Sequence, residues 1–377
     1  MDFGFSEQQR DVQNLAREIL SEQVTVEKLA QYDQYKAERF DRELWAQLSQ
    51  AGLLGVAIDE QYGGMGFGFF ELALLVEEAG RTIAPLPLIS HLVSAALPIQ
   101  QFANAEQKQR WLPGAANGEF LLTAALQEGF HSEAAAPKLS RAEADGNGLR
   151  ISGEKFAVPF AKQAERILLA VQEGEGVTVV LLDPKAEGVR LQAVEATQYE
   201  PQYHLQFDQV WVAAEDILVR GEGAAAMQWI AERSRAAVCA HQLGAADKAM
   251  RMTASYTAER QQFGVPIATF QAVGHRAANC FIDVECLRLN TYQAVSLLDA
   301  NQAASTEVQI AKIWAGDVGH RVSYAAQHLH GGMGIDRDYP LWRYCTWLRH
   351  NEMVLGNSAE GLASLGASIA DGQAFCR

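Results

Sequence analysis

Apolar positions follow a helical period at both ends of the chain. In the first 118 residues they recur every three or four positions, as on one face of a helix. Two such stripes are Val12, Leu15, Ala16, Ile19 and Leu20, and Leu72, Leu75, Val76 and Ala79. From about residue 223 the same period returns and predicts helices over 223–258, 270–300, 306–329, 339–354 and 358–371.

The stretch from about 119 to 222 has a different pattern, with short apolar runs in place of the helical period. Residues 167–171 and 177–182 are short runs rich in β-branched side chains, which predict strands. Asp183-Pro184 ends the second run. Leu205, Phe207, Val210 and Val212 predict a further strand, whose alternation slips by one residue as at a β-bulge.

This order of elements predicts an α+β multidomain chain. We expect an N-terminal helical domain over 1–118, a middle β domain over 119–222 and a C-terminal helical domain over 223–377. A length of 377 residues with 49% hydrophobic residues is enough for two or three units with well-buried cores. The glycines at 63–68 do not form a dinucleotide-binding fingerprint, because the third glycine and the surrounding strand–helix alternation are missing.

Composition narrows the class of partner. The chain carries 46 acidic and 31 basic residues, a formal charge of −15 that argues against nucleic acid and anionic membranes as partners. No apolar run reaches the roughly 18 residues that would span a bilayer. We therefore expect a cytoplasmic protein without membrane insertion. An anionic ligand would need arginines and backbone amides placed locally.

The five cysteines give no sign of a metal centre. Their spacings match no metal-binding pattern and they fall within helical patterns; they are Cys239, Cys280, Cys286, Cys345 and Cys376. We expect reduced, mostly buried thiols and no metal site.

Two glycine-containing stretches near the C-terminus carry candidate chemistry. Residues 256–267 include Arg260, Phe263 and Gly264, and residues 327–334 begin at Gln327 and include two adjacent glycines. A guanidinium is a fixed fork of donors for a diphosphate, and glycine lets backbone approach a ligand closely. The alternative is that Gly264 is a helix C-cap followed by a proline, with the later glycines an ordinary helix stop.

Together these stretches resemble the two signatures of the acyl-CoA dehydrogenase family. The resemblance extends to the start of the chain, where Ser6 and Gln9 predict a capping box, to the Gly-rich turn at 57–66 and to a strand turn at 151–155. It implies an N-terminal helical domain, a middle β-barrel and a C-terminal four-helix bundle. It also implies FAD as the cofactor and the α,β-dehydrogenation of an acyl-CoA thioester.

The family's carboxylate base is not found at either of its usual positions. The position near the start of the last helix is Leu355, and the alternative position, one residue before the family's arginine at Arg235, is Ser234. Glu232 and Glu352 are the nearest carboxylates. A shift of two or three residues along a helix turns a side chain by about 200 or 300 degrees, so neither points in the required direction.

The segment that would face the chain's own flavin also departs from the family pattern. The family's Thr-Glu-Pro-x-Ala-Gly-Ser-Asp matches residues 127–134, where Glu133 stands in place of a phosphate-facing serine. The family's Trp-x-Thr is matched by Ala157 and Pro159, which offer neither a ring to stack nor a hydroxyl.

What remains intact is the set that, in the family, acts across a subunit interface on the neighbour's FAD. These residues, from the Arg-x-x-Phe-Gly and Gln-x-x-Gly-Gly elements, are Arg260, Phe263, Gln271, Gln327, Gly331 and Gly332. The resemblance therefore points to the glutamate-lacking subunit of a heteromeric α2β2 enzyme of lipid or steroid catabolism, paired with a paralogous subunit. Alternatives are a self-sufficient homotetrameric dehydrogenase with a displaced base, a flavin-dependent monooxygenase on the same fold, and a non-enzymatic assembly protein.

The C-terminal helices also predict a large apolar interface. Their apolar residues occupy more than one helix face, which is more than a single core needs, and packing within the chain is the alternative. Examples are Ile310, Ile313, Trp314, Val318 and Val322.

Overall fold

The computed structural model describes residues 4–35, 38–129 and 132–372. By their contacts these residues form two units. The helical unit comprises residues 4–30, 73–84 and 235–372, and the sheet unit comprises residues 31–72 and 85–234. The predicted domain boundaries at 118 and 222 follow a different criterion, the change from helix to strand, and stay a prediction.

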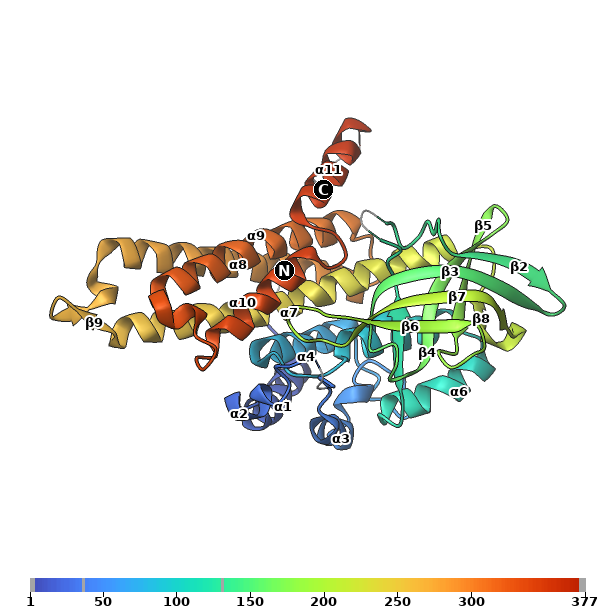
Figure 1. The fold of residues 1–377 in the computed structure, drawn as a ribbon, viewed down its shortest axis with the longest axis horizontal. Helices are drawn as coiled ribbons and strands as arrows, with labels where there is room; N and C mark the ends of the chain where they lie inside the picture. The colour runs from blue at the N-terminus through green and yellow to red at the C-terminus, as the bar shows by residue number, and fades with distance from the viewer. Residues whose placement is uncertain (1–3, 36–37, 130–131, 373–377) are drawn as a thin grey trace. The chain divides into compact units, whose positions relative to one another are not determined.

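Long helices make up most of the helical unit (Figure 1). Its helices are α1 (Glu7–Gln23), α2 (Val26–Ala30), the second part of α4 (Phe69–Thr82), the second part of α7 (Gly223–Glu259), α8 (Gln271–Asp299), α9 (Ser305–His330), α10 (Leu341–Met353) and α11 (Ser358–Ala370). Short elements complete it: β9 (Gln261–Gln262), β10 (Val265–Pro266), and the 3₁₀ turns η5 (Ile267–Thr269) and η6 (Gly331–Ile335). The five predicted C-terminal helices are thus present, with bounds that differ by at most two residues.

Local signals explain where several of these helices begin and how closely they pack. The predicted capping box of α1 is formed, with the Ser6 hydroxyl accepting from the Gln9 amide at 3.1 Å. Gly80 on α4 and Gly244 on α7 allow two backbones to meet. A Cβ at Gly244 would lie 1.9 Å from the Glu77 carbonyl oxygen, so larger side chains cannot be accommodated there.

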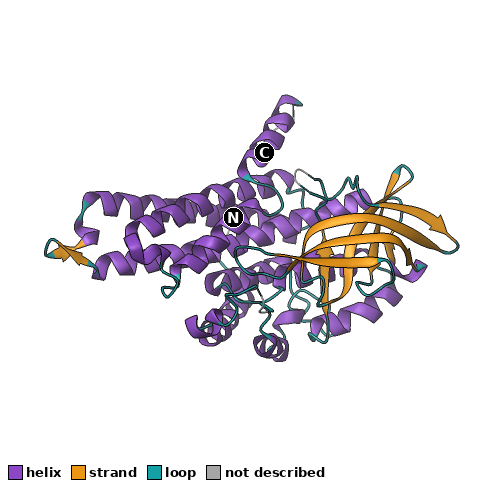
Figure 2. Ribbon diagram, viewed as in Figure 1, coloured by secondary structure: helices purple, strands orange, loops and turns teal. Residues whose placement is uncertain are grey.

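The sheet unit combines one mixed sheet with short helices (Figure 2). Its helical elements are α3 (Arg42–Gln50), η1 (Leu53–Gly55), η2 (Glu60–Tyr62), the π-helix η3 (Ile89–Ala96), α5 (Leu97–Phe102), α6 (Ala105–Ala116), η4 (Ala214–Asp216) and the first parts of α4 and α7. Its strands are β1 (Leu121–Ala125), β2 (Arg141–Asp145), β3 (Gly148–Pro159), β4 (Ala164–Glu173), β5 (Gly176–Leu182), β6 (Val189–Val194), β7 (Gln202–Val212) and β8 (Ile217–Val219). The order is β6-β7-β3-β2-β4-β5-β8, and β1 pairs in parallel with β4.

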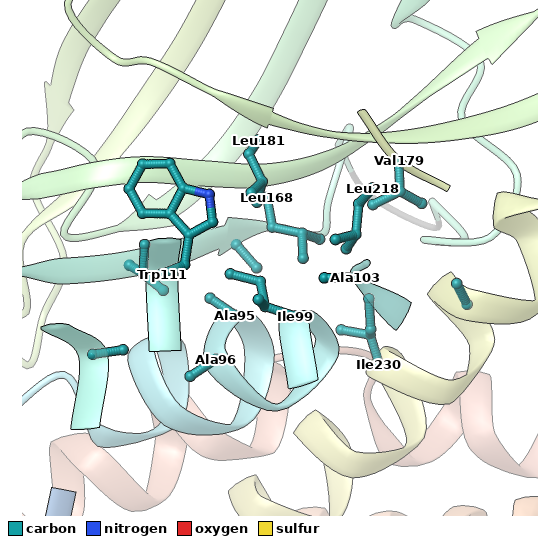
Figure 3. Packing of buried hydrophobic residues seen from close by; sticks show 14 of the residues in the cluster. Ala95, Ala96, Ile99, Ala103, Trp111, Leu168, Val179, Leu181, Leu218 and Ile230 are labelled. Carbon is teal, nitrogen blue, oxygen red and sulfur yellow. The ribbon is translucent and has the colours of Figure 1, made fainter. Parts of the chain in front are cut away.

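Both faces of strands β4 and β5 are buried. Leu168 and Leu181 point toward Ile99 and Trp111 of the neighbouring helices (Figure 3), whereas the alternate residues, such as Leu169, pack into a second apolar cluster among the strands. Burial on two faces explains why these runs are continuously apolar rather than alternating. The predicted slip in β7 is also present, because its register against β3 shifts between the pairs Ile151–Val210 and Gly153–Phe207.

The remaining composition-based expectations can be compared with the described residues. Cys239, Cys280 and Cys345 are buried free thiols and Cys286 is half-buried, while Cys376 lies outside the described residues. Among the helices of the described ranges, none combines the length and the apolar character needed to cross a bilayer.

Candidate functional site

Five of the six predicted cofactor residues lie where helices of the bundle begin or end, and Phe263 lies in the hairpin that joins two of these ends. Because α7, α8 and α9 alternate in direction, the end of α7, the start of α8 and the end of α9 meet at one end of the helical unit. Arg260 directly follows α7, Gln271 begins α8, and Gln327 and Gly331 lie at the end of α9. The Tyr256 hydroxyl, 3.4 Å from the His330 carbonyl oxygen, ties the first of these ends to the last.

The connection from α7 to α8 is a short β-hairpin, labelled by β9 in Figure 1. Gln262 pairs with Val265, and the two residues between them, Phe263 and Gly264, have φ values of 56° and 81°. Positive φ at both central positions is typical of a type I′ hairpin turn. Gly264 is therefore a turn residue, and its interpretation as a helix C-cap is wrong.

Two side chains of this hairpin are presented to solvent. Phe263 is 93% exposed and touches Phe270 edge-on, with ring centroids 6.2 Å apart. Arg260 is also exposed, and within the described part of the chain its guanidinium has no carboxylate partner. An exposed aromatic ring beside an unpaired guanidinium is suited to a ligand or partner that covers both.

The glycines after α9 are not required by packing in this chain. Gly331 ends the helix with φ 59° and ψ −135°, so the expected helix stop is present. A Cβ placed on Gly331 or Gly332 would meet no atom within 4 Å, whereas one on Gly334 would lie 2.6 Å from the Gln327 carbonyl oxygen. The first two glycines thus leave accessible backbone at this end, and the third serves the fold.

His330 fixes the backbone that carries these glycines. Its Nδ1 lies 2.8 Å from the Ala326 carbonyl oxygen and its Nε2 lies 3.2 Å from the Tyr339 hydroxyl. The imidazole stacks on Tyr256 at 4.2 Å, and burial lowers its pKa below the ordinary value. A neutral ring that donates from Nδ1 and accepts at Nε2 satisfies both contacts.

Sequence reasoning missed the residue after Gln327. Gln327 stands four positions before Gly331, so a strict Gln-x-x-Gly-Gly match places His328 where the glutamine would be. His328 is exposed, and its Nδ1 lies 2.6 Å from Nη1 of Arg276 on α8. Counting the spacing would have found His328. Its pairing with Arg276, 52 positions away, carries no sequence signal.

Leu355 lies in a strained loop held by two buried or half-buried cations. Its φ is 58°, in the left-handed region that disfavours residues with a Cβ. Arg235 Nε donates to the Leu355 carbonyl oxygen at 3.0 Å. Lys312 Nζ donates to the carbonyl oxygens of Asn351, Glu352 and Gly356 at 3.1, 3.1 and 2.7 Å, and burial lowers its pKa to about 8.

The polar side chains Glu128 and Ser132 of the segment at 127–134 are hydrogen-bonded to other groups of this chain. The Glu128 carboxylate accepts from the backbone amides of residues 138, 139 and 140 and from Lys155 Nζ at 2.7 Å. The Ser132 hydroxyl accepts from the Glu128 amide and donates to the Gly129 carbonyl. Glu133 is exposed. The polar groups that the structure describes here thus hold the loop together.

The neighbouring strand offers little to a flavin ring. Ala157 has φ 50° and carries only a methyl group, and the Pro159 carbonyl oxygen already accepts from the Thr123 hydroxyl at 2.6 Å.

Comparison with known proteins decides the family. The models for the acyl-CoA dehydrogenase N-terminal and C-terminal domains match residues 6–119 and 221–369. Acyl-CoA dehydrogenase FadE27 of Mycobacterium tuberculosis is 33% identical over 98% of this chain and 99% of its own. The chain belongs to the acyl-CoA dehydrogenase family.

Solved structures of this family give the same fold. One chain of the ChsE4–ChsE5 complex of Mycobacterium tuberculosis superimposes with a TM-score of 0.93 at 33% identity, covering 98% of this chain and 99% of that one. The Tcur3481–Tcur3483 steroid acyl-CoA dehydrogenase variant gives 0.90 at 38% identity, covering 97% and 98%. The predicted order of N-terminal helices, middle β domain and C-terminal helical domain is confirmed, as is the assignment to the acyl-CoA dehydrogenase oxidoreductases.

The candidate base positions of this acyl-CoA dehydrogenase are engaged in other contacts. The Ser234 side chain is fully buried, and its hydroxyl lies 2.8 Å from that of Ser94. Glu232 accepts from the Gln228 amide at 2.7 Å on the same helix face. Glu352 pairs with Arg349 at 2.5 Å. These contacts give Ser234, Glu232 and Glu352 structural roles that do not require proton transfer.

Proposed function

We propose that this acyl-CoA dehydrogenase chain acts as one subunit of a heteromeric complex and completes an FAD site that a paralogous subunit mainly builds. The observation that carries the proposal is the contrast between the two candidate flavin regions. At the hairpin end, Arg260 and Phe263 are exposed beside accessible glycine backbone. In the segment at 127–134, the hydroxyl of Ser132 is bonded to Glu128 and Gly129, and the carboxylate of Glu128 is bonded to the amides of residues 138–140 and to Lys155.

The residues at the hairpin end fit the adenosine diphosphate half of FAD. The Arg260 guanidinium supplies charge-assisted hydrogen bonds to a diphosphate. Gly331 and Gly332 allow backbone to approach it, and the Phe263 ring shields the contact from water. When bound, FAD accepts the hydride that leaves the acyl β-carbon. We infer that this chain contributes binding residues to the site and that the partner supplies the carboxylate base, because Leu355 and Ser234 cannot accept a proton.

Relatives support an assembly of this kind. The structures similar to this chain include the ChsE4–ChsE5 complex and a steroid acyl-CoA dehydrogenase, Tcur3481–Tcur3483. We therefore propose a bulky, steroid-like acyl-CoA thioester as the substrate class and an α2β2 arrangement.

Flavin stoichiometry tests the proposal directly. The chain is purified alone and after co-expression with a neighbouring dehydrogenase gene, and FAD per chain is measured by absorbance after denaturation. We expect little flavin in the chain alone and one FAD per heterodimer in the complex. One FAD per chain in the isolated protein would instead establish a self-sufficient homo-oligomer.

A further inference from the structure

Three side chains from two helices form a cluster at the hairpin end of the helical unit, with Tyr324 and His328 exposed and Arg276 half-buried. Arg276 extends from the second turn of α8, and Tyr324 and His328 lie one turn apart near the end of α9. The Arg276 guanidinium carbon lies 5.8 Å from the Tyr324 ring centroid, and its Nη1 lies 2.6 Å from His328 Nδ1. The two rings are parallel, with an interplanar angle of 6° and centroids 6.2 Å apart.

The contact between Arg276 and His328 defines the tautomer of the imidazole. A guanidinium can only donate, so His328 Nδ1 is the acceptor and Nε2 carries the ring hydrogen. The Nε2–H group and the remaining N–H groups of Arg276 are then donors available to a third party. Among the described residues, no carboxylate lies within ion-pair distance of Arg276, so its charge is not neutralised within the chain.

The cluster of Arg276, Tyr324 and His328 lies close in sequence to the predicted cofactor residues. His328 stands three residues before Gly331, where the family pattern has an amide, and Arg276 is five residues beyond Gln271 at the start of α8. An amide offers one donor group and no charge. The Arg276–His328 pair offers several donors and one positive charge at the same end as Arg260.

We propose that Arg276, oriented by His328 and Tyr324, is a second anion-binding arginine of this end and binds the diphosphate of the partner's FAD together with Arg260. This inference rests on the proposed function, because it needs an FAD held in the partner. Two guanidiniums at one end give that end a local positive charge for an anionic cofactor, although the chain as a whole carries a formal charge of −15.

The experiment measures FAD affinity of the co-expressed complex. The flavin is removed and FAD is titrated back, with binding followed by quenching of flavin fluorescence. Arg276→Leu should raise the Kd roughly 10- to 100-fold, the range expected for loss of a charge-assisted hydrogen bond to a phosphate. His328→Gln, which restores an amide, should retain more affinity than His328→Leu.

Salt dependence separates a ligand contact from a structural one. If Arg276 meets the diphosphate, Arg276→Leu should also flatten the dependence of the Kd on salt concentration, which a purely structural loss would leave unchanged. Arg349→Leu is the control, because Arg349 contacts another α9 histidine, His320, and pairs with Glu352, away from the hairpin end. This variant should change the Kd less than about twofold, as expected for an exposed contact that does not involve the ligand.

Each outcome decides between the two proposals. If Arg260→Ala weakens FAD binding and Arg276→Leu leaves both the Kd and its salt dependence unchanged, the role of Arg276 is wrong and the shared FAD site stands. If neither variant affects FAD, the shared site itself is wrong. If Arg276→Leu lowers the thermal stability of the FAD-free complex in proportion to its loss of affinity, the cluster only joins α8 to α9 and the proposal is overturned.

Discussion

Two groups of arginines in the helical unit differ in whether their guanidiniums are paired with carboxylates of the same chain. Around a cavity of about 460 Å³, the arginines of α1, α4, α7 and α8 are each bonded to buried or half-buried carboxylates. The pairs involve Arg17, Arg81, Arg251 and Arg288 with Glu77, Glu78, Asp247 and Glu285. At the hairpin end, Arg260 and Arg276 have no carboxylate partner among the described residues.

The first group is already satisfied within the chain. Burial raises the pKa of Glu77, and the charge of Arg81 and the Tyr292 hydroxyl oppose that rise. Burial alone would raise the pKa of Asp247, but hydrogen bonds from Arg251 and Arg81 hold it below the ordinary value. A cavity lined by arginines is therefore not by itself an anion site. What distinguishes a binding arginine is the absence of a carboxylate partner.

The largest expected effect follows from breaking the satisfied group. Arg81 bonds to Glu77, Glu78 and Asp247, whose side chains are 0–1% exposed. Arg81→Met removes a cation shared by all three carboxylates and leaves them only the contacts of Arg17, Arg251 and Arg288. It should lower the free energy of unfolding by about 3–5 kcal/mol, measured by urea denaturation. The same replacement at Arg260 should cost less than about 0.5 kcal/mol. Equal losses at the two sites would remove the distinction between the groups.

The reverse effect is expected for cofactor retention. Arg260→Ala should weaken FAD binding in the complex by about 1.5–3 kcal/mol, or one to two powers of ten in Kd. Its fold should remain intact, as judged by circular dichroism. Glu133→Ser, which restores the family's serine in the segment at 127–134, should leave flavin content unchanged. A gain or loss of flavin with Glu133→Ser, together with full retention in Arg260→Ala, would show that the chain holds FAD in its own β domain.

Of the two groups of arginines, acid should weaken the one that is paired with carboxylates. Because the pKa of Asp247 is lowered in the folded state, its contribution to stability is fully present above the ordinary pKa of about 3.9 and is lost as pH falls below it. Asp247→Asn should therefore be less stable than the wild type at neutral pH and lose less stability below about pH 4. Parallel stability curves for the two proteins would contradict this assignment. Arg260→Ala should follow the wild-type curve.

The smallest expected effect is that of a substitution at Gly274, which tests where a partner approaches the hairpin end. Gly274 lies exposed in α8, near Gln271 and Arg276, without a positive φ, and a Cβ there would meet no atom within 4 Å. Gly274→Ala should stabilise the isolated chain by about 0.5–1 kcal/mol, because glycine is a poor helix former. If a partner or its FAD approaches this backbone closely, the same change should weaken the complex. Unchanged assembly would show that the approach is at Gly331 and Gly332 instead.

The sequence predicted those features that depend on residues close to one another along the chain. Apolar periodicity predicted α7 to α10 because each buries apolar residues along its own length, and α11 formed as predicted although none of its residues is buried in this chain. The broken alternation near Val210 predicted the shifted register of β7. Contacts across helices were not predictable: neither Arg276–His328 nor Lys312 with three carbonyl oxygens leaves a pattern in neighbouring residues.

The predicted interface shows the same limit. Val318 and Val322 are 0% and 1% exposed, so these two residues pack within the chain. Ile310, Ile313 and Trp314 are half-buried, and the subunit interface stays a prediction. Periodicity cannot say which apolar face of a helix its own bundle covers. Large exposed apolar residues include Phe281, Ile282 and Leu289 of α8, at 53%, 57% and 63%, and Leu362 and Ile369 of α11, both at 56%.

The loop at Leu355 has an evolutionary consequence. Arg235 and Lys312 still bond its carbonyl oxygens, and Leu355 still adopts the left-handed conformation although this costs free energy. If an ancestral chain carried a glutamate here, only the side chain has been exchanged and the backbone that would aim it has been kept. Such a loss is reversible, and a lineage could regain a base at this position by substitution at one site without rebuilding the loop.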